Sequence, residues 1–212
     1  MAAKQKLENP APPNLGYPSE EYERRVFTES NGALNGYFRN LTAVLSALFG
    51  AKGSRYINAP YGAFQSTADQ TAAAINTAYA MTFDTTDYTN GITVVSSSRI
   101  TVTDSGIYNL QWSGQFENTA SADHDVRVWI KVNGTNLVGS TGFAGIPSKH
   151  GAVNGHTIVG WNYNLSLNAN DYIELWWETD SITVSIQAYA AASNYPSTAS
   201  LIATMQFVSN TI

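Results

Sequence analysis

Three histidines, and the acidic residues beside one of them, are the side chains best suited to bind a metal ion. His150 and His156 lie in the glycine-bearing segment 149–156, KHGAVNGH. A zinc site needs three or four converging ligands, so two histidines on a loop supply too few in a single chain. Asp123-His124-Asp125 alternates carboxylates, but a calcium site requires further oxygen ligands. We therefore expect an acidic turn and a solvated loop, with no metal bound.

The pair Glu174 and Glu178 flanks Trp176 and Trp177, an arrangement similar to the acids and aromatic platforms of a glycosidase. In a strand these two glutamates share one face about 13 Å apart, whereas glycoside hydrolysis needs carboxyls about 5–10 Å apart across a cleft. The sequence also lacks cysteine, a GxSxG nucleophile motif and a GxxxxGK(S/T) phosphate loop. The sequence therefore predicts neither an enzyme nor a cofactor site.

Trp129 and Trp176 are the candidate binding residues. Trp129 points away from the apolar face of segment 126–132, and Trp176 points away from the apolar face of segment 173–177. Outward-facing aromatic side chains have two plausible uses. They bury in contacts between protein chains, where aromatic residues are enriched, or they stack on the sugar ring of a receptor.

The elements that would position these residues are strands, because residues after 58 alternate apolar and polar types. Tyr108, Leu110 and Trp112 share one face of the clearest segment, and Asn133-Gly134 is a hairpin turn signal. Short strands separated by turns predict a mainly β protein, a sandwich or a barrel. The ten predicted strands are Tyr61–Ser66, Tyr79–Phe83, Gly91–Val95, Arg99–Thr103, Gly106–Phe116, Val126–Val132, Val159–Leu167, Ile173–Trp177, Ile182–Ile186 and Leu201–Phe207.

Residues 20–49 are instead predicted to form one amphipathic helix, capped by Ser19 and ended by Gly50 and Gly53. Phe27, Leu34, Leu41 and Leu48 fall seven residues apart. An apolar repeat of this spacing is best buried against copies of itself, so we expect a self-associating stem. The alternative is that the helix packs on its own head domain. The apolar seam comprises Phe27, Leu34, Phe38, Leu41, Leu45 and Leu48.

The chain is expected to have three parts. Residues 1–19 contain four prolines and form an extended anchoring arm, because proline lacks an amide donor and restricts the preceding residue. Residues 20–57 form the helical stem and a linker, and residues 58–212 form the β head. The alternative for the arm is a disordered tail.

Composition excludes several partners. Residues 58–212 carry four Lys and Arg against eleven Asp and Glu, so the head does not suit nucleic acid. No segment approaches the ~20 apolar residues needed to span a bilayer, and the first residues are too polar for a signal peptide. Only 13% of the residues are charged, about half the usual share. We expect a soluble protein that is made in a cytosol. Its weakly charged surface is typical of secreted, viral or oligomeric β proteins.

Several segments of the head resemble the trimeric jelly roll shared by tumour necrosis factor and the globular heads of complement and collagen-type proteins. The segments that carry this resemblance are Ala63-Phe64, 104–108 (DSGIY), 128–134 (VWIKVNG), 165–175 (LSLNANDYIEL) and 201–208 (LIATMQFV). The resemblance implies a ten-strand jelly-roll sandwich that forms a homotrimer. It also favours the interchain contact for Trp129 and Trp176, because such a fold requires a large trimer interface.

The N-terminal part resembles the anchors of small structural proteins in tailed bacteriophages. The features that carry this resemblance are the proline-rich leader, Tyr22, Arg24-Arg25, Phe27 and the apolar helix. The resemblance implies a virion component, namely a fibre, a knob or a capsid decoration, that binds capsid or tail proteins through residues 1–57. The alternative is a receptor-recognition head that binds a host surface glycan.

Overall fold

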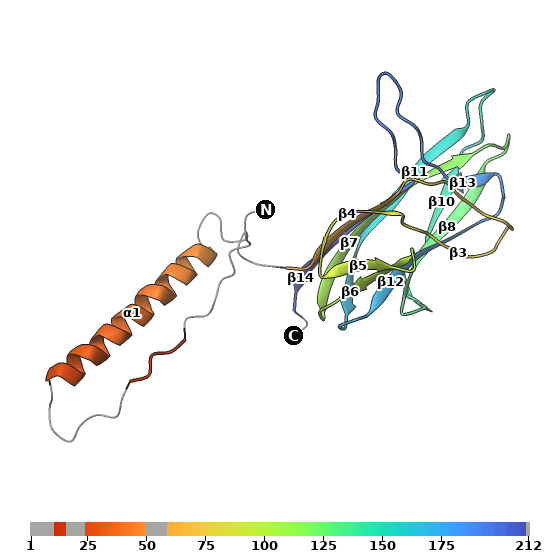
Figure 1. The fold of residues 1–212 in the computed structure, drawn as a ribbon. Helices are drawn as coiled ribbons and strands as arrows, with labels where there is room; N and C mark the ends of the chain where they lie inside the picture. The colour runs from red at the N-terminus through yellow and green to blue at the C-terminus, as the bar shows by residue number, and fades with distance from the viewer. Residues whose placement is uncertain (1–10, 16–23, 50–58, 211–212) are drawn as a thin grey trace. The chain divides into compact units, whose positions relative to one another are not determined.

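The computed structural model describes residues 11–15, 24–49 and 59–210. The chain divides into two compact units, Met1–Asn58 and Ala59–Ile212, which are treated separately below. In the first unit, helix α1 spans Arg24–Phe49 (Figure 1). The predicted helix cap and first turn, the glycines expected to end the helix and most of the predicted arm lie outside the described residues. Residues 11–15 have no regular secondary structure.

The second unit is mainly β. Its strands in chain order are β1 Tyr61–Ser66, β2 Gln70–Thr71, β3 Tyr79–Ala80, β4 Thr85–Asn90, β5 Ile92–Val95, β6 Arg99–Val102, β7 Gly106–Asn118, β8 His124–Val132, β9 Thr135–Asn136, β10 Gly142–Ile146, β11 Gly155–Leu167, β12 Tyr172–Thr179, β13 Val184–Ile186 and β14 Leu201–Ser209.

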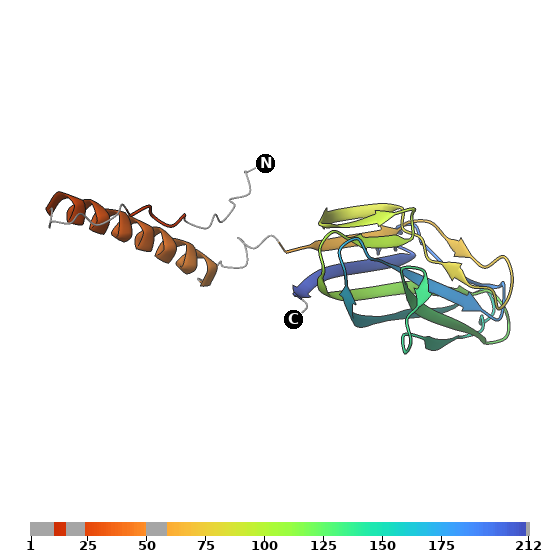
Figure 2. The ribbon, with the colours of Figure 1, turned by 90° about the horizontal axis from the view of Figure 1, so that it is seen from below.

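These strands form two antiparallel sheets. Sheet A runs β2-β13-β7-β14-β1-β4. Strands β13 and β14 pair with successive parts of one edge of β7, and β11 pairs with its other edge. Sheet B runs β10-β8-β12-β6-β5, with β3 on β12 and β9 on β8. Figure 2 shows β14 running between β1 and β7. The two sheets enclose one hydrophobic core, and large side chains from both meet in it, including Tyr108, Phe116 and Trp177.

Each of the ten predicted segments contains a strand, so the mainly β prediction is confirmed. The predicted number of strands is too low, because β2, β4, β9 and β10 were not expected. Strand β4 has the sequence TTDYTN and buries none of its residues, while β10, GFAGI, consists largely of small residues. Neither segment has apolar alternation. Strand β4 is held by pairing to β1, and β10 by pairing to β8 and by the buried Ile146 at its end.

The hairpin turn predicted at Asn133-Gly134 is confirmed between β8 and β9. Both residues have positive φ, 50° and 79°, as a two-residue type I′ turn requires. The side chain of Asn133 holds the turn, because its oxygen accepts from the Tyr172 amide (3.0 Å) and its nitrogen donates to Asp171 (2.8 Å).

Among the described residues, no helix combines the length and apolar character needed to cross a bilayer.

Two neighbouring tryptophans of sheet B test the assignment of its inner and outer faces. Trp177 is buried against Phe116 (centroids 5.8 Å apart) and Tyr79 (6.2 Å), whereas Trp129 on β8 is half-buried on the outer face. We expect Trp177→Ala to lower the free energy of unfolding by about 3–5 kcal/mol because it leaves a cavity. The control Trp129→Ala is expected to cost less than about 1.5 kcal/mol. Urea unfolding of the full chain measures both, and equal costs would contradict the assignment.

Candidate functional site

The head has two ends that differ in what they carry. Strand β7 begins at Gly106, beside Leu167, and ends at Asn118, beside Gly155 and Val184. The chain enters the head near the first of these ends, where Phe207 donates its amide to Pro60 (2.9 Å). The other end, here called the distal end, carries the loops 119–123, 147–154, 180–183 and 187–200. The last of these projects beyond the sheets, at the opposite end of the head from the C-terminus (Figure 1).

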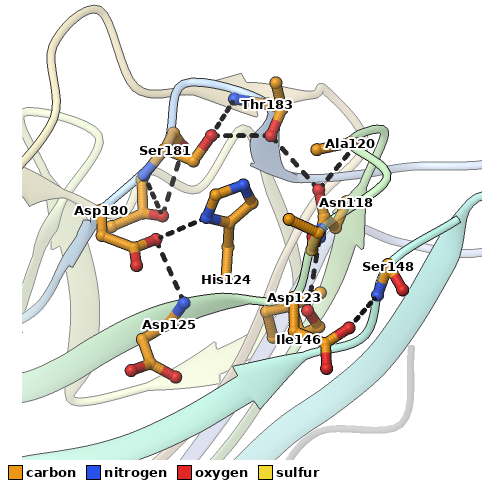
Figure 3. Close-up of polar contacts among 12 residues, drawn as sticks. Asn118, Ala120, Asp123, His124, Asp125, Ile146, Ser148, Asp180, Ser181 and Thr183 are labelled. Carbon is orange, nitrogen blue, oxygen red and sulfur yellow. Dashed lines mark hydrogen bonds and ion pairs between the residues drawn. The ribbon is translucent and has the colours of Figure 1, made fainter.

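Asn118 ties three of the distal loops together (Figure 3). Its side chain is fully buried, and its nitrogen donates to the carbonyls of Ala122 (2.8 Å), Pro147 (3.2 Å) and Ile146 (3.3 Å). Its oxygen accepts from the Ala120 amide (2.9 Å) and the Thr183 hydroxyl (3.2 Å). One amide therefore pairs backbone groups of loops 119–123 and 147–154 and the hydroxyl of a residue in loop 180–183.

The acidic tripeptide 123–125 is engaged by its surroundings. Asp180 accepts from the His124 ring (Nδ1, 3.1 Å) and from the Asp125 amide (3.1 Å), as Figure 3 shows. Asp123 accepts from the Ser148 amide at 2.7 Å, and this hydrogen bond lowers the pKa of Asp123. Within the described part of the chain, no three His, Cys, Asp or Glu side chains lie close enough together to hold a metal ion. The hydrogen bonds of Asp123 and Asp180 therefore join the distal loops to one another and to β8.

The projecting loop 187–200 is anchored by Tyr189. Its hydroxyl donates to Glu117 (2.8 Å) and lies 3.1 Å from His156 Nδ1. Burial and the hydrogen bond to Glu117 raise the pKa of Tyr189, so the phenol stays protonated at neutral pH. Of the histidines proposed as weak metal candidates, His156 thus belongs to this contact. The backbone of His150 forms a tight turn with Val153.

Trp129 and Trp176 lie opposite each other on the outer face of sheet B, at paired positions of β8 and β12. Trp129 Nε1 donates to Asn136 (3.0 Å), and the ammonium of Lys131 lies 3.5 Å from the centroid of the Trp176 ring. Both indoles are half-buried. The structure therefore brings the two predicted residues together, but it already covers one face of Trp176 with a charged side chain.

Charged pairs lie on both sides of these tryptophans. Arg127 pairs with Glu178 (2.7 Å), and this contact raises the pKa of Arg127. Glu174 is buried, accepts from Ser98 Oγ (2.7 Å) and lies 3.7 Å from Arg99 Nε. The two glutamates of the glycosidase-like pattern are thus each engaged by their own partners.

Most of the outer face of sheet A has the opposite character. Along β11, β7 and β14 it presents neutral polar side chains with scattered isoleucine and valine, and the charged residues Glu117 and His156 lie at its distal end. An amide cluster occupies its middle, where Asn109 donates to Asn162 (2.7 Å) and Asn164 (2.7 Å). The residues of this surface, here called the neutral face, are Ile158, Gly160, Asn162, Asn164, Ser166, Ile107, Asn109, Gln111, Ser113, Gln115, Ile202, Thr204, Gln206 and Val208.

The predicted stem residues lie on α1. Phe27, Phe38 and Leu45 are exposed, Phe38 by 56% and Leu45 by 43%. Leu34 and Leu41 are half-buried. Leu48 also lies within α1, but its side chain is outside the described part of the chain.

The sequence did not point to Asn118, Asp180, Tyr189 or the neutral face. The first three become significant through hydrogen bonds that span 29 to 72 residues along the chain. The neutral face does have a signal in the sequence, because the polar positions of segments 106–116, 159–167 and 201–207 contain no charge. Comparing those positions with the charged ones of segments 126–132 and 173–177 would have identified it.

Removing the Asn118 amide tests its role at the distal end. We expect Asn118→Ala to lower the free energy of unfolding by about 3 kcal/mol, since buried carbonyl and amide groups lose their partner. The control Asn164→Ala removes an exposed amide and should cost at most about 0.5 kcal/mol. Chemical denaturation of the full chain measures both. Equal losses would show that the distal loops do not depend on Asn118.

The lowered pKa of Asp123 predicts a pH-dependent contribution to stability. A carboxyl with a lower pKa in the folded state stabilises above its unfolded pKa of about 3.9 and loses this effect as the pH falls further. We expect Asp123→Asn to be less stable than the native chain at pH 7 and to approach it below about pH 4. Thermal unfolding across this range measures the difference. A difference that persists unchanged at acidic pH would contradict the assignment.

Comparison with known proteins does not assign the chain to a family. No protein-family model matches the sequence, and no curated protein matches it significantly. The function proposed below therefore rests on the geometry of the head and of α1.

Proposed function

We propose that this chain is a homotrimeric structural protein of a bacteriophage virion, a fibre, knob or capsid decoration that displays its β head. Residues 1–57 would attach it to capsid or tail proteins. The observation that carries the proposal is the contrast between the outer faces of the two sheets, one neutral and one charged. The neutral face would provide a surface for self-association on one side of the head.

The strand pairing supports a jelly-roll head. The principal strands in chain order are β1, β6, β7, β8, β10, β11, β12 and β14. The first pairs with the last, β6 with β12, β7 with β11 and β8 with β10. Such nested pairing divides the strands between two sheets, as in the double Greek key of a jelly roll. The trimeric heads that the sequence resembles have this jelly-roll fold.

The neutral face is the better candidate for the trimer contact. Interface cores are depleted of charged residues, because desolvating an unpaired charge is costly. Ile158 and Ile202 are 67% and 45% exposed within it. Trp129 and Trp176, by contrast, lie between ion pairs on sheet B, and Lys131 covers one face of Trp176. We therefore place the contact between heads on the neutral face and keep the two tryptophans as a secondary candidate.

The position of the chain entry supports display. Because β1 begins at the end opposite the long loops, a head held by its N-terminal segment would present those loops outward. The exposed residues Phe38 and Leu45 on α1 suit burial between three parallel helices. Helices in proteins are stabilised mainly by packing of their apolar face rather than by propensity, so association would stabilise α1.

A charge placed in the neutral face tests the trimer contact. We expect Ile158→Arg and Ile202→Arg to dissociate the trimer or to weaken it by at least tenfold, because each buries an unpaired charge. Ile182→Arg is the matched control, since Ile182 is 62% exposed in a distal loop. Analytical ultracentrifugation of the three full-length variants measures the change. Intact trimers in both neutral-face variants would overturn this placement.

Truncation tests the anchor. A chain that lacks residues 1–57 is expected to keep a folded head and to lose incorporation into particles. The measurement is immunoblotting of purified particles from cells that express the tagged full or truncated chain during infection by the virus that encodes it. Circular dichroism of the truncated protein controls for folding. Incorporation of the truncated chain would refute the anchoring role of the N-terminal part.

The second candidate function is receptor recognition by the head, through a glycan on the host surface. It is favoured by a pocket at the distal end, where a displayed head would meet a host. The tryptophan pair is a poorer glycan platform, since Lys131 covers one face of Trp176.

A further inference from the structure

A pocket of about 540 Å³ lies at the root of the projecting loop 187–200. One wall is the segment that follows β1 and includes Thr67 and Asp69. The other wall is formed by both arms of the loop and includes Tyr189 and Thr198. Its volume lies within the usual range of small-molecule sites, about 300–1,000 Å³.

Hydrogen bonds hold both walls in place. The buried Ser200 donates its amide to Ser66 (2.9 Å) and its hydroxyl to the carbonyl of Ala68 (2.7 Å), which joins the loop to the β1 wall. Tyr189 and Thr198 exchange backbone hydrogen bonds of 3.0 and 2.9 Å, so the two arms of the loop form a short ribbon. The pocket is thus largely preformed.

Hydrogen bonds also hold side chains that line the pocket. Thr67 is fixed by Asp84, which accepts from its amide (2.9 Å) and its hydroxyl (2.9 Å). The hydroxyl of Tyr189 donates to Glu117, which sets the position of the ring. A site whose groups are already ordered loses little conformational entropy when it binds a ligand.

The carboxylate of Asp69 is the strongest acceptor in the pocket. It accepts from the Ala188 amide at 2.8 Å. The Gln187 nitrogen lies 3.0 Å from each carboxylate oxygen, in the amide orientation that lets the Gln187 oxygen accept from Ser185 Oγ. Each oxygen of a carboxylate has two acceptor sites, so Asp69 retains capacity for a ligand.

The remaining lining groups define the class of ligand. Thr67, Ser197 and Thr198 offer hydroxyls, and Tyr189 offers an apolar ring with a fixed position. No lysine, arginine or histidine is among the described residues that line the pocket, so it has no cation to pair with phosphate, sulfate or carboxylate. One acceptor carboxylate, several hydroxyls and one aromatic ring match the adjacent hydroxyls and the apolar side of a neutral sugar.

We propose that this pocket binds a single neutral hexose unit of a surface glycan. Asp69 would accept hydrogen bonds from adjacent sugar hydroxyls, and the ring of Tyr189 would pack against the apolar side of the sugar. The proposal rests on the receptor-recognition candidate above and names its ligand class and its location.

Saturation-transfer NMR on the full-length protein tests the proposal. The probes are methyl α-D-glucopyranoside, methyl β-D-galactopyranoside and methyl α-D-mannopyranoside, with N-acetylneuraminic acid as the anionic comparison. We expect transfer to at least one neutral hexoside and none to the anionic sugar. Asp69→Ala removes the acceptor, and Ala190→Trp fills the pocket from its exposed side without removing a side-chain contact.

Both variants should weaken binding about tenfold or more, Asp69→Ala because a hydrogen bond to a charged group is lost and Ala190→Trp because the indole occupies the space of the sugar. Asp104→Asn changes an exposed carboxylate at the opposite end of the head, and Trp176→Ala changes the sheet B platform. Both controls should bind normally. Transfer to no neutral hexoside, transfer to the anionic sugar instead, or undiminished binding by Ala190→Trp would each overturn the proposal.

The sedimentation mass of the same samples separates this result from the structural function. A trimer that binds no neutral hexoside would refute the sugar site and leave the virion proposal intact. A monomer that binds the sugar through this pocket would support the site and count against the homotrimer.

Discussion

The register of strand β7 is the constraint on which the head depends. Its thirteen residues pair along their whole length with β11 on one side and with β14 and β13 on the other. Because side chains alternate along a strand, this register sends Tyr108, Leu110 and Phe116 into the core and Asn109 and Gln111 to the neutral face. A shift by one residue would exchange the two sets, exposing the core and burying the amides.

The same register places Asn118 at the distal end, where its buried amide satisfies the loops that follow β7, β10 and β12. Core, neutral face and loop-bearing end are therefore properties of one strand and its partners. The projecting loop depends on this arrangement as well, since Tyr189 is held by Glu117 near the end of β7. A head of this kind presents different chemistry on each surface without any disulfide.

The charges of the head follow this division. The ion pairs of Arg127 with Glu178 and of Arg99 with Glu174 lie on sheet B, whereas on the outer face of sheet A the pair of Glu117 with His156 lies only at the distal margin of the neutral face. Asp123, Asp125 and Asp180 gather at the distal end, where His124 and backbone amides engage two of them. Asp123, Asp125, Asp180 and Glu178 thus lie on surfaces that the proposed trimer leaves open to solvent.

The alternating pattern of the sequence was sufficient to predict the mainly β fold and the approximate position of the ten segments with apolar alternation. It did not predict β4 or β10, because the residues of β4 are polar and those of β10 are largely small, so neither segment alternates apolar and polar types. The candidate site was less predictable. Trp129 and Trp176 could be placed on an outer face, but the covering of Trp176 by Lys131 depends on the register between β8 and β12.

The pocket depends on even more distant contacts. Asp69 and Ala188 lie 119 residues apart in the chain, and neither belongs to a recognisable motif. Ser200 and Ser66 are joined across 134 residues. No local pattern encodes such contacts, because they result from the way β1 and β14 pair in sheet A.

The central claim is that the head associates through the neutral face, and the mass of the head alone tests it most directly. Light scattering of residues 59–212, measured beside the full chain, gives both masses in solution. The account predicts a mass three times that of one chain in both samples. A monomeric head beside a trimeric full chain would contradict it, because association would then reside in the helix and the neutral face would be free.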